Sequence, residues 1–115
     1  MDAYNANPTS MKASIESFSA FSYHPKHLIL GDMFELGSES LREHTAVVEQ
    51  IKKHPFKEVF LVGPLFEKAA KHSRYKCFPT TMSLCTYLAE KPLSEGAILI
   101  KGSRGIQLEN VLENL

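Results

Sequence analysis

The chain has 115 residues, of which 43% are hydrophobic and 23% charged, and its 13 basic and 13 acidic side chains give a formal net charge of zero. This composition is typical of one globular domain and excludes a disordered, fibrous or disulfide-stapled chain. No apolar run approaches the roughly 18 residues of a membrane span, and the N-terminus lacks the features of a signal peptide. We therefore expect a cytoplasmic protein without membrane insertion, and the balanced charge argues against nucleic acid as its main partner.

Short apolar runs alternate with amphipathic stretches along the chain, which is the pattern of βαβ units. The predicted strands are 27–30, 58–62, a weaker 75–78 and 97–100. Three of them are continuously apolar, as expected for parallel strands covered on both faces. The sequence therefore predicts a single α/β domain over residues 1–115, with a three-layer, Rossmann-like architecture: a mostly parallel twisted sheet and helices on both faces.

Five helices are predicted before, between and after these strands. The first has Asn7 as N-cap and Pro8 at its first position, and the second begins near Ser38 with a capping box, Ser40-x-x-Glu43. The others are 65–72, 80–90 and 106 to the C-terminus. The side chains expected to face the core are Met11, Ile15, Phe18 and Phe21 in the first helix, Leu41, Val47, Val48 and Ile51 in the second, Met82, Cys85 and Leu88 in the fourth, and Leu108, Val111, Leu112 and Leu115 in the fifth.

The start of the chain is short for such a domain. Only Met1 to Tyr4 precede the loop 5–8, so we expect either that the opening strand is a stub or that the chain was cut from a longer protein, and we favour the cut. Cys77 and Cys85 have no C-x-x-C spacing and the five histidines have no metal-binding spacing, so neither a disulfide nor a metal site is expected. His44, at the edge of an apolar stripe, is expected to be a hydrogen-bonded packing residue.

Three polar loops follow the predicted carboxyl ends of strands, where ligands bind in doubly wound sheets. The first is 2–8, where Tyr4 offers a stacking face, Asp2 an acceptor for ribose hydroxyls, and Asn5 and Asn7 amides that donate and accept. Asn7 is also a good helix N-cap, and the two roles are compatible.

The loop 101–105 combines two cations with backbone freedom. Lys101 and Arg104 supply positive donors, Ser103 a hydroxyl, and Gly102 and Gly105 a tight turn. This pattern indicates either an anion site for a phosphate or carboxylate, or an ordinary strand-to-helix turn. It is not a P-loop, because G-x-x-x-x-G-K-[ST] does not occur in the chain.

The loop 31–37 contains two carboxylates, Asp32 and Glu35. They could hold an ammonium group, orient a lysine or share a proton, or they could serve only the turn. A further alternative is a receiver-like signalling module in which Asp32 accepts a phosphoryl group beside Lys101. A stand-alone nucleotide-binding domain is a third possibility.

Taken together, the three loops resemble the C-terminal domain of a Mur ligase. The phrases that carry the resemblance are Asp2-Ala3-Tyr4-Asn5-Ala6-Asn7-Pro8, Gly31-Asp32-Met33-Phe34-Glu35-Leu36-Gly37 and Lys101-Gly102-Ser103-Arg104-Gly105. They occur in the family's order, and the first two are most like the member that adds D-Ala-D-Ala to UDP-N-acetylmuramoyl-tripeptide in peptidoglycan synthesis.

The resemblance implies a three-domain, ATP-dependent ligase. ATP phosphorylates the tripeptide's terminal carboxylate, and the amine of D-Ala-D-Ala then displaces the phosphate to form a peptide bond. The central ATPase domain would hold most of the ATP and the Mg²⁺, and the present domain would pack on it as a lid that excludes water. The isolated domain would be inactive, and no catalytic or metal-binding residue is assigned to it.

The resemblance also implies roles for individual residues. Asp2, Tyr4 and Asn5 would contact the adenosine end of the nucleotide, with Asn7 near the phosphates or the reacting carboxyl. The loop of Lys101, Gly102, Ser103 and Arg104 would bind the carboxylate of the acceptor dipeptide or the phosphates of the closed state. Asp32 and Glu35 would bind the dipeptide's ammonium group or order their own loop.

Overall fold

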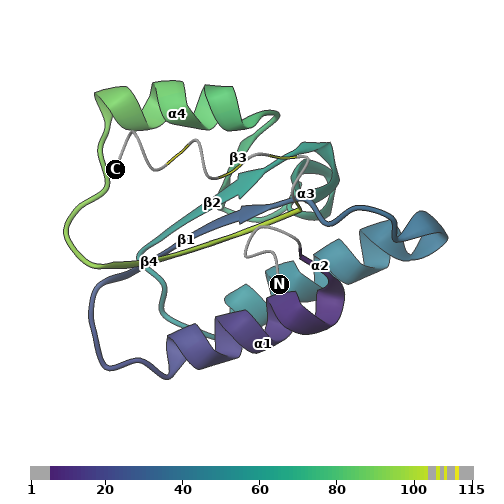
Figure 1. Cartoon of the computed structure of the whole chain (residues 1–115), viewed down its shortest axis with the longest axis horizontal. Coiled ribbons are helices and arrows are strands. Elements are labelled where there is room, and N and C mark those ends of the chain that lie inside the picture. The colour runs from purple at the N-terminus through teal and green to yellow at the C-terminus, as the bar shows by residue number, and fades with distance from the viewer. Residues whose placement is uncertain (1–5, 104–105, 107, 109–110, 112–115) are drawn as a thin grey trace.

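The computed structural model describes residues 6–103, 106, 108 and 111, which form one parallel sheet with helices on both faces (Figure 1). The strands are β1 (Lys26–Gly31), β2 (Glu58–Val62), β3 (Lys76–Phe78) and β4 (Ala97–Lys101). Their order is β3-β2-β1-β4, and every neighbouring pair is parallel. The predicted α/β class and parallel sheet are therefore confirmed.

The helices divide into two layers around this sheet. They are α1 (Pro8–Ser19), a 3₁₀ helix η1 (Gly37–Glu39), α2 (Ser40–Ile51), α3 (Pro64–Ala69) and α4 (Thr81–Glu90). Figure 1 shows α1 and α2 on one side of the sheet and α4 on the other. No helix in the part of the chain that the structure describes is long and apolar enough to cross a membrane.

Side chains alternate between the two faces of the sheet along each strand, so a hydrophobic core forms on each face. Leu28 and Leu30 of β1 point to the side of α1, α2 and α3, whereas Ile29 points to the side of α4. Leu108 and Val111, from the predicted fifth helix, are fully buried in the α4 core. The rest of that prediction, including Leu112 and Leu115, lies outside the described residues, as do Met1 to Asn5.

Asn7 begins α1 as predicted. Its side chain accepts a hydrogen bond from the Ser10 backbone N–H at 2.9 Å, and the Ser10 hydroxyl lies 3.2 Å from the Asn7 N–H, which closes a capping box. Pro8 occupies the first helical position, where its missing N–H costs no hydrogen bond. The prediction for α2 is wrong in one detail: its N-cap is Glu39, without a side-chain bond, because η1 runs directly into the helix and places Ser40 in helical geometry.

Three predicted core residues are exposed. Leu41 is 50% exposed because the first turn of α2 projects beyond the sheet (Figure 1). Phe21 is 60% exposed because α1 already ends at Ser19. Met82 is 78% exposed because α4 buries Thr81, Leu84 and Leu88 instead, a stripe rotated by one residue.

The order of the strands places the polar loops. From β1 the chain adds β2 and β3 on one side and then returns to the other side of β1 for β4. The carboxyl ends of β1 and β4 are therefore adjacent at the switch point of the sheet, where α/β domains bind ligands. Figure 1 shows the first turn of α1 at this same edge.

Candidate functional site

The loops after β1 and β4 are joined by two hydrogen bonds. The Ser103 N–H donates to the Asp32 carbonyl at 3.0 Å, and the Phe34 N–H donates to the Ser103 hydroxyl oxygen at 2.9 Å. Ser103 is only 4% exposed. The candidate anion-binding residue Ser103 therefore also fixes the position of the neighbouring loop, and its hydroxyl proton has no acceptor among the described residues.

Gly102 allows the two loops to approach this closely. A Cβ atom on Gly102 would lie 2.9 Å from the Cα of Gly31 and 2.8 Å from the Cδ1 of Leu108. Both distances are shorter than real Cβ contacts, and one of the atoms belongs to the backbone. Close packing, more than contact with a ligand, accounts for glycine at this position.

Asp32 is buried under α3 and uses both carboxylate oxygens there. Its Oδ1 accepts from the Phe66 N–H at 2.8 Å and its Oδ2 from the Leu65 N–H at 2.9 Å, so it caps the first turn of α3. Gly63 makes room for it, since a Cβ there would lie 2.3 Å from the carboxylate. Burial raises the pKa of the Asp32 carboxyl above its ordinary value, and the two N–H donors partly offset this.

These contacts order the loop after β1. They give no support to the receiver-like alternative, because a phosphate acceptor must reach solvent and Asp32 is fully buried. The structure also does not bring Asp32 and Glu35 together as a carboxylate pair. Glu35 is exposed and adopts a left-handed backbone conformation, with φ of 65°. It remains a candidate for contact with a ligand's ammonium group.

His44 holds the same loop from α2. Its Nδ1 lies 2.7 Å from the Ser40 carbonyl oxygen, which can only accept, so Nδ1 carries the proton. Its Nε2 accepts from the Met33 N–H at 3.0 Å, and its ring meets Phe66 edge-on at 4.7 Å between centroids. The prediction of a hydrogen-bonded packing histidine is confirmed.

Replacing His44 with alanine is expected to lower the free energy of unfolding by about 2–3 kcal/mol, because the buried Met33 N–H loses its acceptor, the half-buried Ser40 carbonyl loses a donor, and a ring-sized cavity forms. Urea denaturation followed by circular dichroism measures the effect. The matched control, His24→Ala, changes an exposed loop histidine and should leave stability within about 0.5 kcal/mol. Equal stabilities of the two variants would contradict the assigned role.

Lys101 and Asn7 present the remaining polar groups at this edge. Lys101 is the last residue of β4, half-buried, and its ammonium group makes no hydrogen bond or ion pair with another described residue. Asn7 is exposed at the start of α1. The candidate residues Asp2, Tyr4, Asn5 and Arg104 lie outside the described residues. Within the described ranges, no group of three His, Cys, Asp or Glu side chains could hold a metal ion.

A family model described as "Mur ligase, glutamate ligase domain" matches residues 1–104 of this chain. The chain therefore belongs to the Mur ligase family, as a domain of that type. It is similar to the UDP-N-acetylmuramoyl-tripeptide–D-alanyl-D-alanine ligases of Bacillus subtilis (37% identical over 99% of this chain) and Rickettsia prowazekii (34% over 97%). It spans about a quarter of the length of these relatives, 27% and 26%.

Solved structures agree with this assignment. The chain superimposes on MurF from Acinetobacter baumannii with a TM-score of 0.80 and 29% identity, covering 99% of this chain and 26% of that one. It superimposes on the MurF ligase from Thermotoga maritima in complex with ADP with a TM-score of 0.78 and 27% identity, covering 98% and 26%. The three-layer architecture of the MurF C-terminal region is thus the fold of this chain.

Proposed function

We propose that this chain acts as the C-terminal domain of a cytoplasmic three-domain ligase that uses ATP to join D-Ala-D-Ala to UDP-N-acetylmuramoyl-tripeptide in peptidoglycan synthesis. The observation that carries the proposal is the pair of hydrogen bonds through Ser103, which unites the loops after β1 and β4 at the switch point. Beside them lies Lys101, whose ammonium group has no partner among the described residues. The similarity to ligases of this specificity over nearly the whole chain supports the choice of substrates.

In this proposal the edge formed by the three loops closes over the reacting groups as a lid. Lys101 and Arg104 bind the carboxylate of the acceptor dipeptide or the phosphates of the closed state, and Ser103 donates its hydroxyl proton to the same anion. Glu35 receives the dipeptide's ammonium group, while Asp32 and His44 keep its loop in place. Asp2, Tyr4 and Asn5 contact the adenosine end, with Asn7 beside the phosphates.

The nucleotide and its metal fit this domain to different degrees. The described edge offers the ammonium group of Lys101, which suits a phosphate. The first turn of α1 adds little to it, because Pro8 has no N–H and the Ser10 N–H already donates to the Asn7 side chain. It offers no carboxylate cluster for Mg²⁺, because Asp32 is fully engaged and Glu35 is separate from it. We therefore assign Mg²⁺ to the central ATPase domain of the proposed ligase.

Replacing Lys101 with methionine in the full-length ligase is expected to raise the KM for D-Ala-D-Ala, or to lower kcat, by about ten- to a hundredfold, since a charge-assisted hydrogen bond contributes about 1.5–3 kcal/mol. Replacing Arg104 with alanine should have an effect of at least about tenfold for the same reason. Steady-state kinetics with each substrate varied in turn measures both effects.

The matched control is Lys91→Met, which removes a lysine from the C-terminal end of α4, where its ammonium group lies 5.8 Å from the Tyr87 ring centroid. This variant should retain the parent kinetics. Unchanged kinetics in Lys101→Met and Arg104→Ala would refute the anion-binding role proposed for the loop after β4.

A further inference from the structure

The zero net charge of the chain conceals a strong separation of charge. Seven of the thirteen basic residues lie between residues 52 and 76, together with only two of the thirteen acidic ones. This tract therefore carries a charge of +5 and the remainder of the chain −5. The seven cations are Lys52, Lys53, Lys57, Lys68, Lys71, Arg74 and Lys76, and all are exposed.

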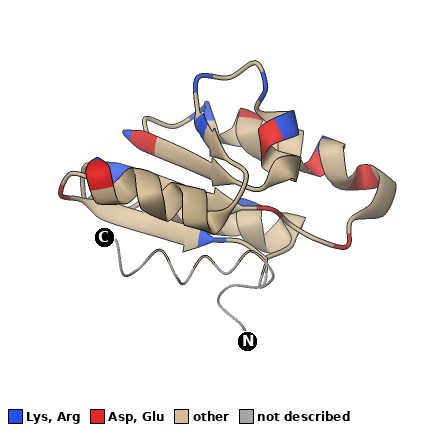
Figure 2. Cartoon of the chain, turned by 90° about the horizontal axis from the view of Figure 1, so that it is seen from above, with Lys and Arg blue, Asp and Glu red and all other residues tan. Residues whose placement is uncertain are grey.

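These cations gather at the opposite edge of the sheet from the candidate functional site. Lys68 lies in the last turn of α3, and the other six follow the C-terminal ends of α2 and α3, up to Lys76, the first residue of β3. These positions lie at the amino edge of the sheet. Figure 2 shows basic segments along the loop that leads from α3 to β3. Because the loops after β1 and β4 leave from the carboxyl edge, the basic surface is separate from the proposed ligase site.

A cavity of about 310 Å³ lies within this surface, lined by Lys52, Ser73, Arg74 and Tyr75. The Arg74 guanidinium lies 6.0 Å from the centre of the Tyr75 ring and forms no ion pair with another described residue. Among the described residues, Lys52 pairs only with the exposed Glu49 of α2, at 2.9 Å, and exposed pairs of this kind exchange readily with solvent ions. The Tyr75 hydroxyl makes no hydrogen bond to a described residue, so the Arg74 guanidinium and the Tyr75 hydroxyl line this cavity without a described acceptor, beside the solvent-exposed Lys52–Glu49 pair.

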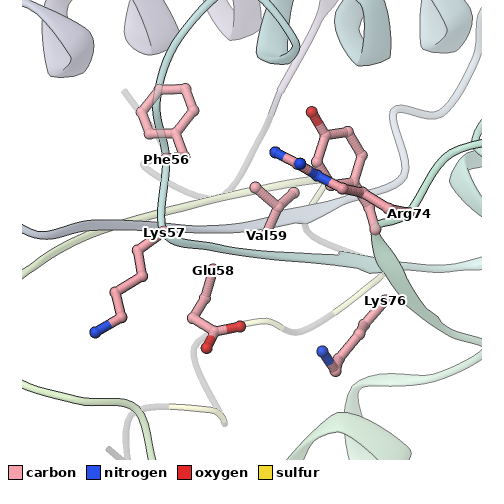
Figure 3. A pocket seen from close by; sticks show the side chains of 7 residues that line it. Phe56, Lys57, Glu58, Val59, Arg74 and Lys76 are labelled. Atoms are coloured by element: carbon pink, nitrogen blue, oxygen red, sulfur yellow. The ribbon is translucent and has the colours of Figure 1, made fainter.

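A second cavity of about 180 Å³ continues around the edge of the sheet and shares Arg74 and Tyr75 with the first. Figure 3 shows Arg74 on the same side of the strands as Phe56, and Lys57 and Lys76 on the other side with Glu58 between them. Neither Lys57 nor Lys76 forms an ion pair with a described residue within 4.0 Å. The two cavities together expose four cations against one carboxylate.

We propose that these adjoining cavities form a second anion-binding site, which takes a small ligand with two linked phosphate groups. One phosphate binds Lys52, Arg74 and the Tyr75 hydroxyl, because a guanidinium fork matches the oxygens of a phosphate. The other binds Lys57 and Lys76 around the sheet edge. A small ligand is favoured over an extended polyanion because the donors converge on two adjoining, half-open cavities that share Arg74 and Tyr75.

Titration of the 115-residue chain with inorganic pyrophosphate, followed by isothermal calorimetry at low salt, tests this site. Pyrophosphate is expected to bind at least about tenfold more tightly than inorganic phosphate, since two anionic groups are engaged together. The double variant Lys52→Gln/Arg74→Gln should weaken binding at least about tenfold. Circular dichroism establishes that this variant is folded, which is expected because both residues are exposed.

The control, Lys12→Gln, removes one positive charge from α1, where Lys12 pairs with Glu43 at 3.5 Å. It should bind pyrophosphate as the parent chain does. Equal losses of pyrophosphate affinity in the control and in the double variant would overturn the proposal, because the loss would then reflect the overall charge of the chain and not a specific site. Binding to vesicles of phosphatidylglycerol without binding to pyrophosphate would also overturn it, in favour of a lipid surface. These outcomes are independent of ligase activity.

Discussion

Replacing Asp32 with alanine is expected to lower the free energy of unfolding by about 3–5 kcal/mol, because two buried N–H groups then lose a charged acceptor. The carboxylate accepts from Leu65 and Phe66 at 2.9 and 2.8 Å and is fully buried. No side chain other than Asp32 caps the first turn of α3 in the described structure. Urea denaturation of the parent chain and the variant measures the loss.

The control for this prediction is Glu35→Ala, which removes the other carboxylate of the same loop. Because Glu35 is exposed and its side chain forms no hydrogen bond or ion pair with a described residue, stability should change by less than about 0.5 kcal/mol. In the full-length ligase, however, Glu35→Ala should impair use of the acceptor dipeptide if Glu35 receives its ammonium group. Similar stabilities of Asp32→Ala and Glu35→Ala would refute the assignment of a structural role to Asp32 and not to Glu35.

Replacing Gly102 with alanine is expected to lower the free energy of unfolding by about 2–4 kcal/mol, through overpacking against a backbone that cannot move aside cheaply. The added methyl group would lie 2.9 Å from the Cα of Gly31 and 2.8 Å from the Cδ1 of Leu108. Relief of this clash must separate the loops after β1 and β4. The full-length ligase should therefore also lose at least about tenfold in kcat/KM, since a displacement of about 1 Å can cost a hundredfold.

Gly37→Ala provides the comparison. A Cβ on Gly37 would meet no atom within 4 Å, so only its positive φ of 58° opposes alanine, at about 1–2 kcal/mol. Thermal unfolding of the two variants separates steric clash from backbone strain. An alanine at position 102 that leaves the chain as stable as the parent would show that the two loops are free to move apart.

Local sequence patterns were sufficient for the regular elements. The continuous apolar runs predicted β1, β2 and β4, and β2 has the predicted bounds of 58–62. The central strands β1 and β2 are buried on both faces, whereas the edge strand β4 is half-buried. Asn7 and Thr80 cap α1 and α4 because their side chains reach backbone N–H groups three residues along the chain. The predictions that Leu41 and Met82 face the core were wrong. Which face of a helix packs on the core depends on neighbours that are distant in the sequence.

The same distinction between local pattern and tertiary contact applies to the three polar loops. Their residue types alone indicated an anion-binding edge and resembled those of the Mur ligases, and the family assignment is confirmed. The sequence by itself thus determined the fold class, the strands and the loops that meet at the switch point, because apolar periodicity and loop composition are local properties. Only the tertiary structure decided that Asp32 caps α3, that His44 and Ser103 fix the loop after β1, and that a chain of zero net charge concentrates its cations at the amino edge of the sheet. Each of these depends on contacts between segments far apart in the sequence, such as the 34 residues that separate Asp32 from Phe66.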